Sequence, residues 1–164
     1  MAKHKEEKTN VMRVLEQKKI AYTAHSYPHE EGVAVDGVTV AKSMGFDPAQ
    51  VFKTLVARGE KTGINVFCIP VCCELNLKKA AKAAGDKNME LVAVKELLGL
   101  TGYIRGGCSP VGMKKKYPTY IEETAVLFDE IAVSAGQRGV QMFVDPEKLA
   151  AFTGAELTSL VKEM

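Results

Sequence analysis

Apolar and polar residues recur along this chain with two periods, which divide it into short helices and short strands. Apolar positions three to four residues apart predict a helix over residues 10–18, with Thr9 or Asn10 as its cap. Runs rich in β-branched residues predict two successive strands at 51–57 and 64–71. Shorter runs predict a helix at 94–100 and further strands at 21–27, 89–92, 103–105, 119–121, 131–134 and 140–144.

Start and stop signals define other helices. Asn76 is a suitable cap for a helix at 77–84, and Gly85 suits the left-handed conformation that ends one. Asp145 followed by Pro146 is a typical N-cap and first helical residue. We therefore expect one or two short helices over the last twenty residues.

The segment 33–40 allows two structures. It can form a hairpin with a tight turn at Asp36 and Gly37. It can instead start a helix capped by Asp36 and ended by Gly45. We favour the helix because its stop signal is clear.

Length and composition indicate one globular domain. The 164 residues are 46% hydrophobic and 26% charged, which is far from a disordered composition. Helices and strands are interleaved without a regular strand–helix–strand repeat, so we predict an α/β protein of α+β type, with a mixed sheet surrounded by helices. We expect residues 1–164 to form this single domain, with residues 1–8 flexible.

Charge and hydropathy limit the partners and the cellular location that we expect for this protein. The net charge of +2 excludes a histone-like electrostatic binder and leaves room for a local basic patch. The longest apolar stretch, 66–73, is far shorter than the roughly 18 residues of a membrane span. The charged residues 1–8 lack the apolar core of a secretory signal. We expect a cytoplasmic protein with no membrane partner.

The four cysteines do not have the spacing of a metal site. Cys68, Cys72 and Cys73 crowd one apolar segment, and Cys108 stands alone. Zinc favours two separated pairs. We interpret all four as reduced thiols that act as small apolar residues, and we expect no metal and no cofactor.

Lys53 is the first candidate for chemistry. Alternation places it on the same strand face as Val51 and Leu55. An ammonium on an apolar face must reach solvent, pair with an anion or point into a cleft. In a cleft it would suit a carboxylate, a phosphate or a developing oxyanion.

Two glycine-rich segments and a basic run follow. Residues 102–112, GYIRGGCSPVG, can expose backbone amides to negative charge or form a structural loop. Residues 134–139, SAGQRG, are typical of a hairpin turn. Lys114, Lys115 and Lys116 either coat a solvated surface or contact nucleic acid beside that loop.

The sequence contains no Gly-x-Ser-x-Gly nucleophile elbow. It also offers no clear cysteine–histidine pair, because the three histidines all lie near the amino terminus. If the protein is an enzyme, its nucleophile and base need not both be its own side chains.

Four of these motifs occur in the order seen in YbaK/EbsC proteins, and the chain resembles that family from about residue 10 to its end. They are FKTLV at 52–56, LKKAAK at 77–82, TGYIRGGCSPVG at 101–112 and SAGQRG at 134–139. The branch it resembles is that of the Cys-tRNA(Pro) deacylases, free-standing relatives of the editing domain in bacterial prolyl-tRNA synthetase.

The resemblance implies a partly barrel-like mixed sheet and removal of cysteine from mischarged proline tRNA, through attack of the substrate thiol on its own ester. It implies an essential role for Lys53, with Gly106 and Gly107 at the ester. From their position beside this loop, we expect Lys114, Lys115 and Lys116 to contact the tRNA. The resemblance also implies the acceptor end of an aminoacyl-tRNA and prolyl-tRNA synthetase as partners. The substrate-binding residues that it implies are Tyr27, Asp36, Thr54, Ser109, Pro110, Ser134, Gly136 and Gln141.

Two positions differ from some family members and bear on amino-acid preference. Gln141 stands where those members carry Asp, and Asp36 precedes Gly37 where they carry Phe. Two alternatives therefore stay open: an Ala-tRNA(Pro) deacylase that uses water, and an inactive module that binds tRNA or a synthetase.

Overall fold

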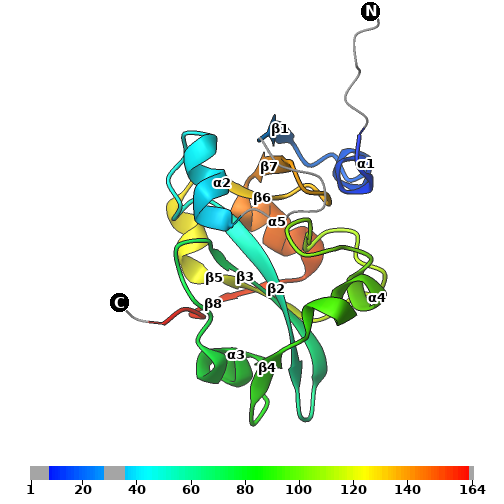
Figure 1. Ribbon diagram of the computed structural model, residues 1–164, viewed down its shortest axis with the longest axis vertical. Coiled ribbons are helices and arrows are strands. Elements are labelled where there is room, and N and C mark those ends of the chain that lie inside the picture. The colour runs from blue at the N-terminus through cyan, green and yellow to red at the C-terminus, as the bar shows by residue number, and fades with distance from the viewer. Residues whose placement is uncertain (1–7, 28–35, 163–164) are drawn as a thin grey trace, which may run out of the picture.

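The structure, a computed structural model, describes residues 8–27 and 36–162. Helices and short strands alternate along it (Figure 1). In chain order the elements are α1 (Asn10–Gln17), β1 (Tyr22–Ser26), α2 (Gly37–Ser43), β2 (Phe52–Gly59), β3 (Gly63–Pro70), α3 (Leu77–Ala84), β4 (Met89–Leu91), η1 (Val94–Glu96), α4 (Leu97–Thr101), β5 (Thr119–Glu122), η2 (Glu123–Leu127), β6 (Ile131–Ser134), β7 (Val140–Val144), α5 (Pro146–Thr153) and β8 (Glu156–Thr158).

The strands form two sheets, which confirms the predicted mixed α+β fold. One has the order β1-β7-β6 and is antiparallel, and the other has the order β4-β2-β3-β5-β8 and is mixed. A parallel bridge between Val51 and Ala132 joins them. The strand orders within the described ranges show two open sheets joined at a corner, not a closed barrel.

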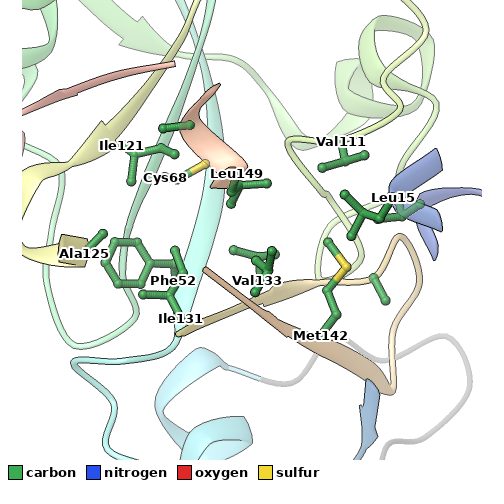
Figure 2. Packing of buried hydrophobic residues seen from close by; sticks show 14 of the residues in the cluster. Leu15, Phe52, Cys68, Val111, Ile121, Ala125, Ile131, Val133, Met142 and Leu149 are labelled. Carbon is green, nitrogen blue, oxygen red and sulfur yellow. The ribbon is translucent and has the colours of Figure 1, made fainter. Parts of the chain in front are cut away.

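Three apolar clusters hold the layers together. The largest lies between the two sheets, where Phe52 and Cys68 of the mixed sheet meet Val133 and Met142 of the antiparallel one (Figure 2). A second cluster packs α3 against β2 and β3, and a third packs α2 against Val51 and the β6–β7 pair. The two helices therefore cover the two ends of one face of β2 (Figure 1).

Caps account for most of the helix boundaries. The side chains of Thr9, Asp36, Asn76 and Asp145 each accept a backbone amide at the start of a helix. Because residues 37–43 are helical, the helix interpretation of the Asp36 segment is confirmed and the hairpin is wrong. Residues 33–35 of the alternative hairpin, and residues 1–7, for which we expect flexibility, lie outside the described residues.

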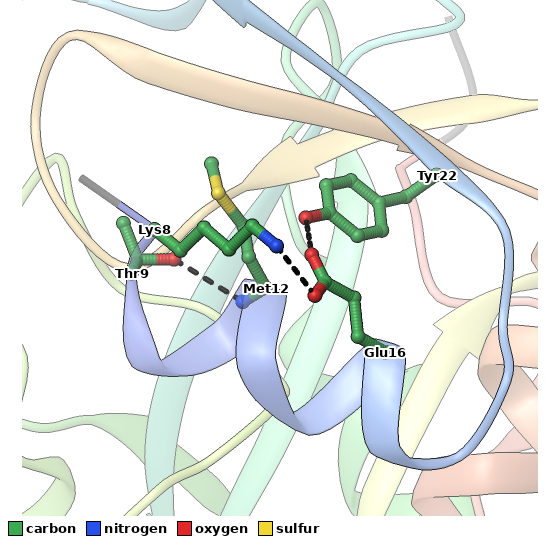
Figure 3. Close-up of polar contacts among 5 residues, drawn as sticks. All are labelled: Lys8, Thr9, Met12, Glu16 and Tyr22. Carbon is green, nitrogen blue, oxygen red and sulfur yellow. Dashed lines mark hydrogen bonds and ion pairs between the residues drawn. The ribbon is translucent and has the colours of Figure 1, made fainter. Parts of the chain in front are cut away.

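A polar cluster fastens α1 to β1 (Figure 3). Glu16 accepts hydrogen bonds from Lys8 Nζ, at 2.8 Å, and from the hydroxyl of Tyr22. These bonds lower the pKa of Glu16, while burial and the bond to Glu16 raise the pKa of Tyr22 to about 12. Lys8 is thus tied to the helix.

Asp86 fastens the turn between β2 and β3. Its carboxylate accepts hydrogen bonds from the amides of Lys61, Thr62 and Lys87, and from the hydroxyl of Thr62. Burial acts to raise the pKa of Asp86, but these bonds outweigh it and hold the pKa well below its ordinary value.

One predicted strand was wrong. Residues 103–105 do not form a strand, because Gly102 ends α4 at a φ of 88° and a turn begins at Ile104. Of the one or two helices expected at the end of the chain, one is present, α5, and it is followed by β8, which was not predicted because a three-residue strand is too short to show alternation. Among the described residues, no helix is both long enough and apolar enough to cross a membrane.

Candidate functional site

Lys53 lies between two apolar clusters on one face of β2. It pairs with Ile69 of β3, and its neighbours on that face are Val51, which packs under α2, and Leu55, which packs toward α3. The predicted alternation is confirmed. Lys53 is half-buried, and its register position lies between the parts of β2 that pack toward α2 and toward α3.

Ser134 and Gln141 share this face. Val51 and Ala132 form a parallel bridge and pack in the same cluster, so their side chains lie on the same face. Because side chains alternate along a strand, Lys53 and Ser134, each two residues later, also lie on that face. Ser134 is directly opposite Gln141 in the β6–β7 register. We call this surface, which carries Lys53, Ser134 and Gln141, the Lys53 face.

Gln141 has an unpaired acceptor. The residue is 7% exposed, and its Oε1 is buried without a hydrogen-bond partner within the described part of the chain. A buried carbonyl in that state costs free energy unless a ligand supplies a donor. Ser134, also 7% exposed, uses its Oγ to accept the amide of Gly136 at 3.1 Å.

The glycine loop at 102–112 and the hairpin at 134–139 are packed against each other. A Cβ on Gly107 would lie 3.0 Å from Cα of Gln137, so a larger residue here would push against the hairpin backbone. Arg138 Nε donates to the carbonyl of Arg105 at 2.7 Å. Gly136, with a φ of 100°, lies against Val11 of α1. The base of the hairpin thus carries Ser134 on the Lys53 face, while its tip packs against the loop.

The loop amides differ in availability. The N–H of Gly107 donates to the carbonyl of Ile104 at 2.9 Å in a turn that places Gly106 at a φ of 88°. Gly106 is exposed, and its N–H has no acceptor among the residues that are described. Cys108, Ser109 and Pro110 are buried. Convergence of the Lys53 ammonium with these amides stays a prediction.

Three predicted substrate residues have other environments. Thr54 points to the opposite face of β2, where its Oγ1 lies 3.7 Å from Sγ of Cys68, so it does not join Lys53. The carboxylate of Asp36 caps α2 by accepting from the amide of Val38 and the hydroxyl of Thr39. Tyr27 is buried at the end of β1, and its amide donates to the carbonyl of Gly139 at 2.9 Å.

The two thiols inside the fold, Cys68 and Cys108, are held in the protonated form by burial. Burial raises the pKa of Cys68 to about 12 and that of Cys108 to about 11. The interpretation of these two as small apolar residues is confirmed by their burial, whereas Cys72 is exposed and was misassigned. Thus neither Cys68 nor Cys108 is suited to act as a nucleophile.

A separate pocket adjoins the basic run. Its volume is about 260 Å³, and it lies where the end of the glycine loop meets α5. The three lysines are exposed, and Lys115 and Lys116 are on its wall. Tyr117 and Phe152, which we had not singled out, also line it; the signal was an aromatic residue directly after the lysines. Lys53 is not among its lining residues.

Comparisons with known proteins agree with one another. The family model for the aminoacyl-tRNA editing domain matches residues 32–152. The chain is 45% identical over 161 residues, 98% of each chain, to a protein of Enterococcus faecalis (strain ATCC 700802 / V583) named "Putative Cys-tRNA(Pro)/Cys-tRNA(Cys) deacylase EbsC".

Two solved structures have folds similar to that of this chain. One, described as "a putative trans-editing enzyme for prolyl tRNA synthetase", has a TM-score of 0.80 and 27% identity, covering 93% of this chain and 95% of the other. A hypothetical protein, APE2540, matches in fold with a TM-score of 0.82 at 20% identity, covering 93% of this chain and 99% of its own. From the family match and the close relative, this chain belongs to the aminoacyl-tRNA editing domain family.

Proposed function

We propose that this protein is a cytoplasmic trans-editing deacylase that removes cysteine from mischarged Cys-tRNA(Pro), and that the whole chain, 1–164, forms its one editing domain. Membership of the editing family and the name of the Enterococcus relative support the substrate class. The observation that carries the assignment is the Lys53 face, which combines a half-buried ammonium with the unpaired carbonyl of Gln141.

The nucleophile we propose is the thiol of the substrate cysteine. The protein's own Cys68 and Cys108 are held protonated by burial, so they offer no competing nucleophile. Sulfur attacks the ester carbonyl carbon, the carbon–oxygen bond to the ribose breaks, and the thiol proton passes to the ribose oxygen. The product is a cysteine thiolactone, which water opens. Holding the thiol against its own ester supplies the proximity that the reaction needs.

Lys53 orients the ester. We assign its ammonium to the terminal phosphate or ribose, because a compact charge with three donors suits oxygen anions. We assign Gly106 N–H to the carbonyl oxygen as negative charge develops, since the Gly107 amide is already engaged in the turn. Loss of one such donor typically costs about 3–4 kcal/mol of barrier.

Gln141 would recognise the amino group of the substrate. Every aminoacyl ester carries an α-ammonium, which is a strong donor, and Oε1 of Gln141 is an acceptor without a partner among the described residues. Pairing the two would relieve the buried carbonyl, so the site favours an aminoacyl ester over a simple acyl ester.

The acceptor end of the tRNA would follow the basic run. Lys115 and Lys116 border the pocket that contains the rings of Tyr117 and Phe152. Cationic side chains beside aromatic faces are suited to single-stranded nucleic acid. We also infer that prolyl-tRNA synthetase assists in selecting the tRNA, and a pull-down with tRNA present that recovers no synthetase would count against this partner.

The decisive experiment replaces Lys53 with alanine. Lys53→Ala should abolish deacylation of Cys-tRNA(Pro) and leave thermal unfolding nearly unchanged, because the side chain is only half-buried. Lys148→Ala, at an exposed position of α5, is the matched control and should retain parental activity. If Lys53→Ala deacylates at the parental rate, the assignment is wrong. A panel of Cys-tRNA(Pro), Cys-tRNA(Cys) and Ala-tRNA(Pro) separates thiol-assisted cleavage from cleavage by water.

A further inference from the structure

Cys72 and Cys73 form a vicinal pair in the turn between β3 and α3. Their Sγ atoms are 3.8 Å apart, and both thiols are free. Cys72 is exposed and Cys73 is half-buried, whereas Cys68 and Cys108 are buried. An electrophile in solution therefore meets Cys72 first, and the neighbouring sulfur is already within contact distance.

This turn adjoins Lys53. The two cysteines follow shortly after Ile69, which pairs with Lys53 in the β2–β3 register, and the positive charge of Lys53 acts to lower the pKa of both Cys73 and Glu74. Burial, and then the contact with Cys72, raise the pKa of Cys73 to about 11, with the charge of Lys53 opposing them. Cys73 is therefore protonated at neutral pH, and its sulfur lies in contact with that of the exposed Cys72.

The turn is anchored on both sides. The amide of Val71 donates to the carbonyl of Val51 at 2.8 Å, and a Cβ on Gly37 would lie only 2.4 Å from Val71 Cγ1. After the turn, the amide of Asn76 donates to the carbonyl of Leu160 at 2.8 Å. Any movement of the two cysteines must be absorbed between these anchors, beside Lys53.

A bond between the two sulfurs would be strained. Adjacent Cα atoms across a trans peptide are about 3.8 Å apart, which is less than the roughly 4.4–6.8 Å usual for a disulfide. The sulfurs would have to approach from 3.8 Å to about 2.05 Å. Strained, exposed disulfides are readily reduced, which suits a reversible modification.

We propose that Cys72 and Cys73 are a thiol modification site, which hydroperoxides oxidise to a vicinal disulfide, and that its closure disables Lys53. The thiolate of Cys72 attacks one peroxide oxygen, the oxygen–oxygen bond breaks and one water leaves. The thiol of Cys73 then attacks the resulting sulfenic acid, a sulfur–sulfur bond forms and a second water leaves. Two thiols and one hydrogen peroxide thus give one disulfide and two waters. The effect on deacylation rests on the proposed function.

The test uses the full chain, reduced and then treated with hydrogen peroxide. Peptide mass spectrometry should show loss of two hydrogens from the segment that contains both cysteines, and dithiothreitol should reverse it. Cys72→Ser and Cys73→Ser should each abolish this loss, which excludes Cys68 as the partner. In Cys73→Ser the reaction should stop at the Cys72 sulfenic acid, which dimedone traps.

Two functional readouts accompany the mass measurement. Deacylation of Cys-tRNA(Pro) should fall roughly tenfold to a hundredfold on closure, since displacement of a positioning group by about 1 Å costs that much. The rate at which an amine-reactive ester labels Lys53 should also change. The peroxide-treated Cys73→Ser variant should show neither effect.

The outcomes separate the two proposals. Oxidation of Cys72 to sulfinic acid without closure would overturn the modification site. Closure that alters neither readout would overturn the link to Lys53. If the reduced protein has no deacylase activity, only the proposed function is overturned. The peptide mass and the labelling of Lys53 do not depend on that activity, so they would still test the formation of the disulfide and its effect on Lys53.

Discussion

Replacing Gln141 with methionine should stabilise this protein and impair it at the same time. Methionine keeps the length and much of the volume of glutamine but removes Oε1, a buried acceptor without a partner in the described structure. An unsatisfied buried polar group costs about 1–3 kcal/mol, so the free energy of unfolding should rise by about that amount. For a chain of this size, that corresponds to an increase in Tm of about 2–12 °C.

Activity should change in the opposite direction. If Oε1 accepts the α-ammonium of the substrate, a hydrogen bond to a charged group worth about 1.5–3 kcal/mol is lost, and kcat/KM should fall roughly tenfold to a hundredfold. Thermal unfolding and deacylation of Cys-tRNA(Pro) measure the two effects on one preparation. Because they have opposite signs, simple damage to the fold cannot mimic them.

A neighbour on the same strand supplies the control. Met142 is fully buried and packs on the opposite face of β7, between the sheets. Met142→Leu conserves volume, so it should cost less than about 1.5 kcal/mol and leave kcat/KM unchanged. A lower Tm for Gln141→Met together with parental kcat/KM would refute the reasoning, because it would show that the carbonyl is already paired and does not meet the substrate.

Three further predictions test the loop, a carboxylate and the basic run. Gly107→Ala should lower deacylation, because the new Cβ would lie 3.0 Å from the hairpin backbone, whereas Gly99→Ala, with nothing within 4 Å, should retain activity and add about 0.5–1 kcal/mol of stability. The pKa of Asp86 is lower in the fold than its ordinary 3.8, so its stabilisation is present above about pH 4 and is lost as pH falls through the folded-state pKa. The urea midpoint should therefore fall on acidification, and less so in Asp86→Asn. Replacing Lys115 and Lys116 with glutamine should weaken tRNA binding and reduce the salt slope by about 0.7 per lost phosphate contact; an unchanged slope would exclude the contact.

The helices were largely readable from local sequence. Asn76, Gly85 and Asp145 occupy the predicted cap positions, because a cap is decided by a side chain and amides two or three residues away. Strands β6 and β7 were also placed correctly, because short runs of consecutive apolar residues are typical of strands that are buried on both faces. The same alternation placed Lys53 correctly beside Val51 and Leu55 on β2.

Tertiary contacts decided what local rules could not. Glu122 is 2% exposed yet accepts the amides of Thr124 and Leu160, a role that its own neighbours do not indicate. Strand β8 forms because it pairs in parallel with β5. In this pairing Glu156 lies opposite Tyr120, which is 36 positions earlier in the chain. Such elements are stabilised by distant partners, so their three-residue sequences carry little signal.

Sequence alone determined the chemistry available to the site: one lysine on an apolar strand face, two glycine segments and a basic run. The fold decided how they are combined. The bridge between Val51 and Ala132 places Ser134 and Gln141 on the same face as Lys53, while Gly107 packs on the hairpin tip. The face on which a residue lies follows from periodicity, but which strands adjoin depends on long-range burial and register, and these exist only once the chain has folded.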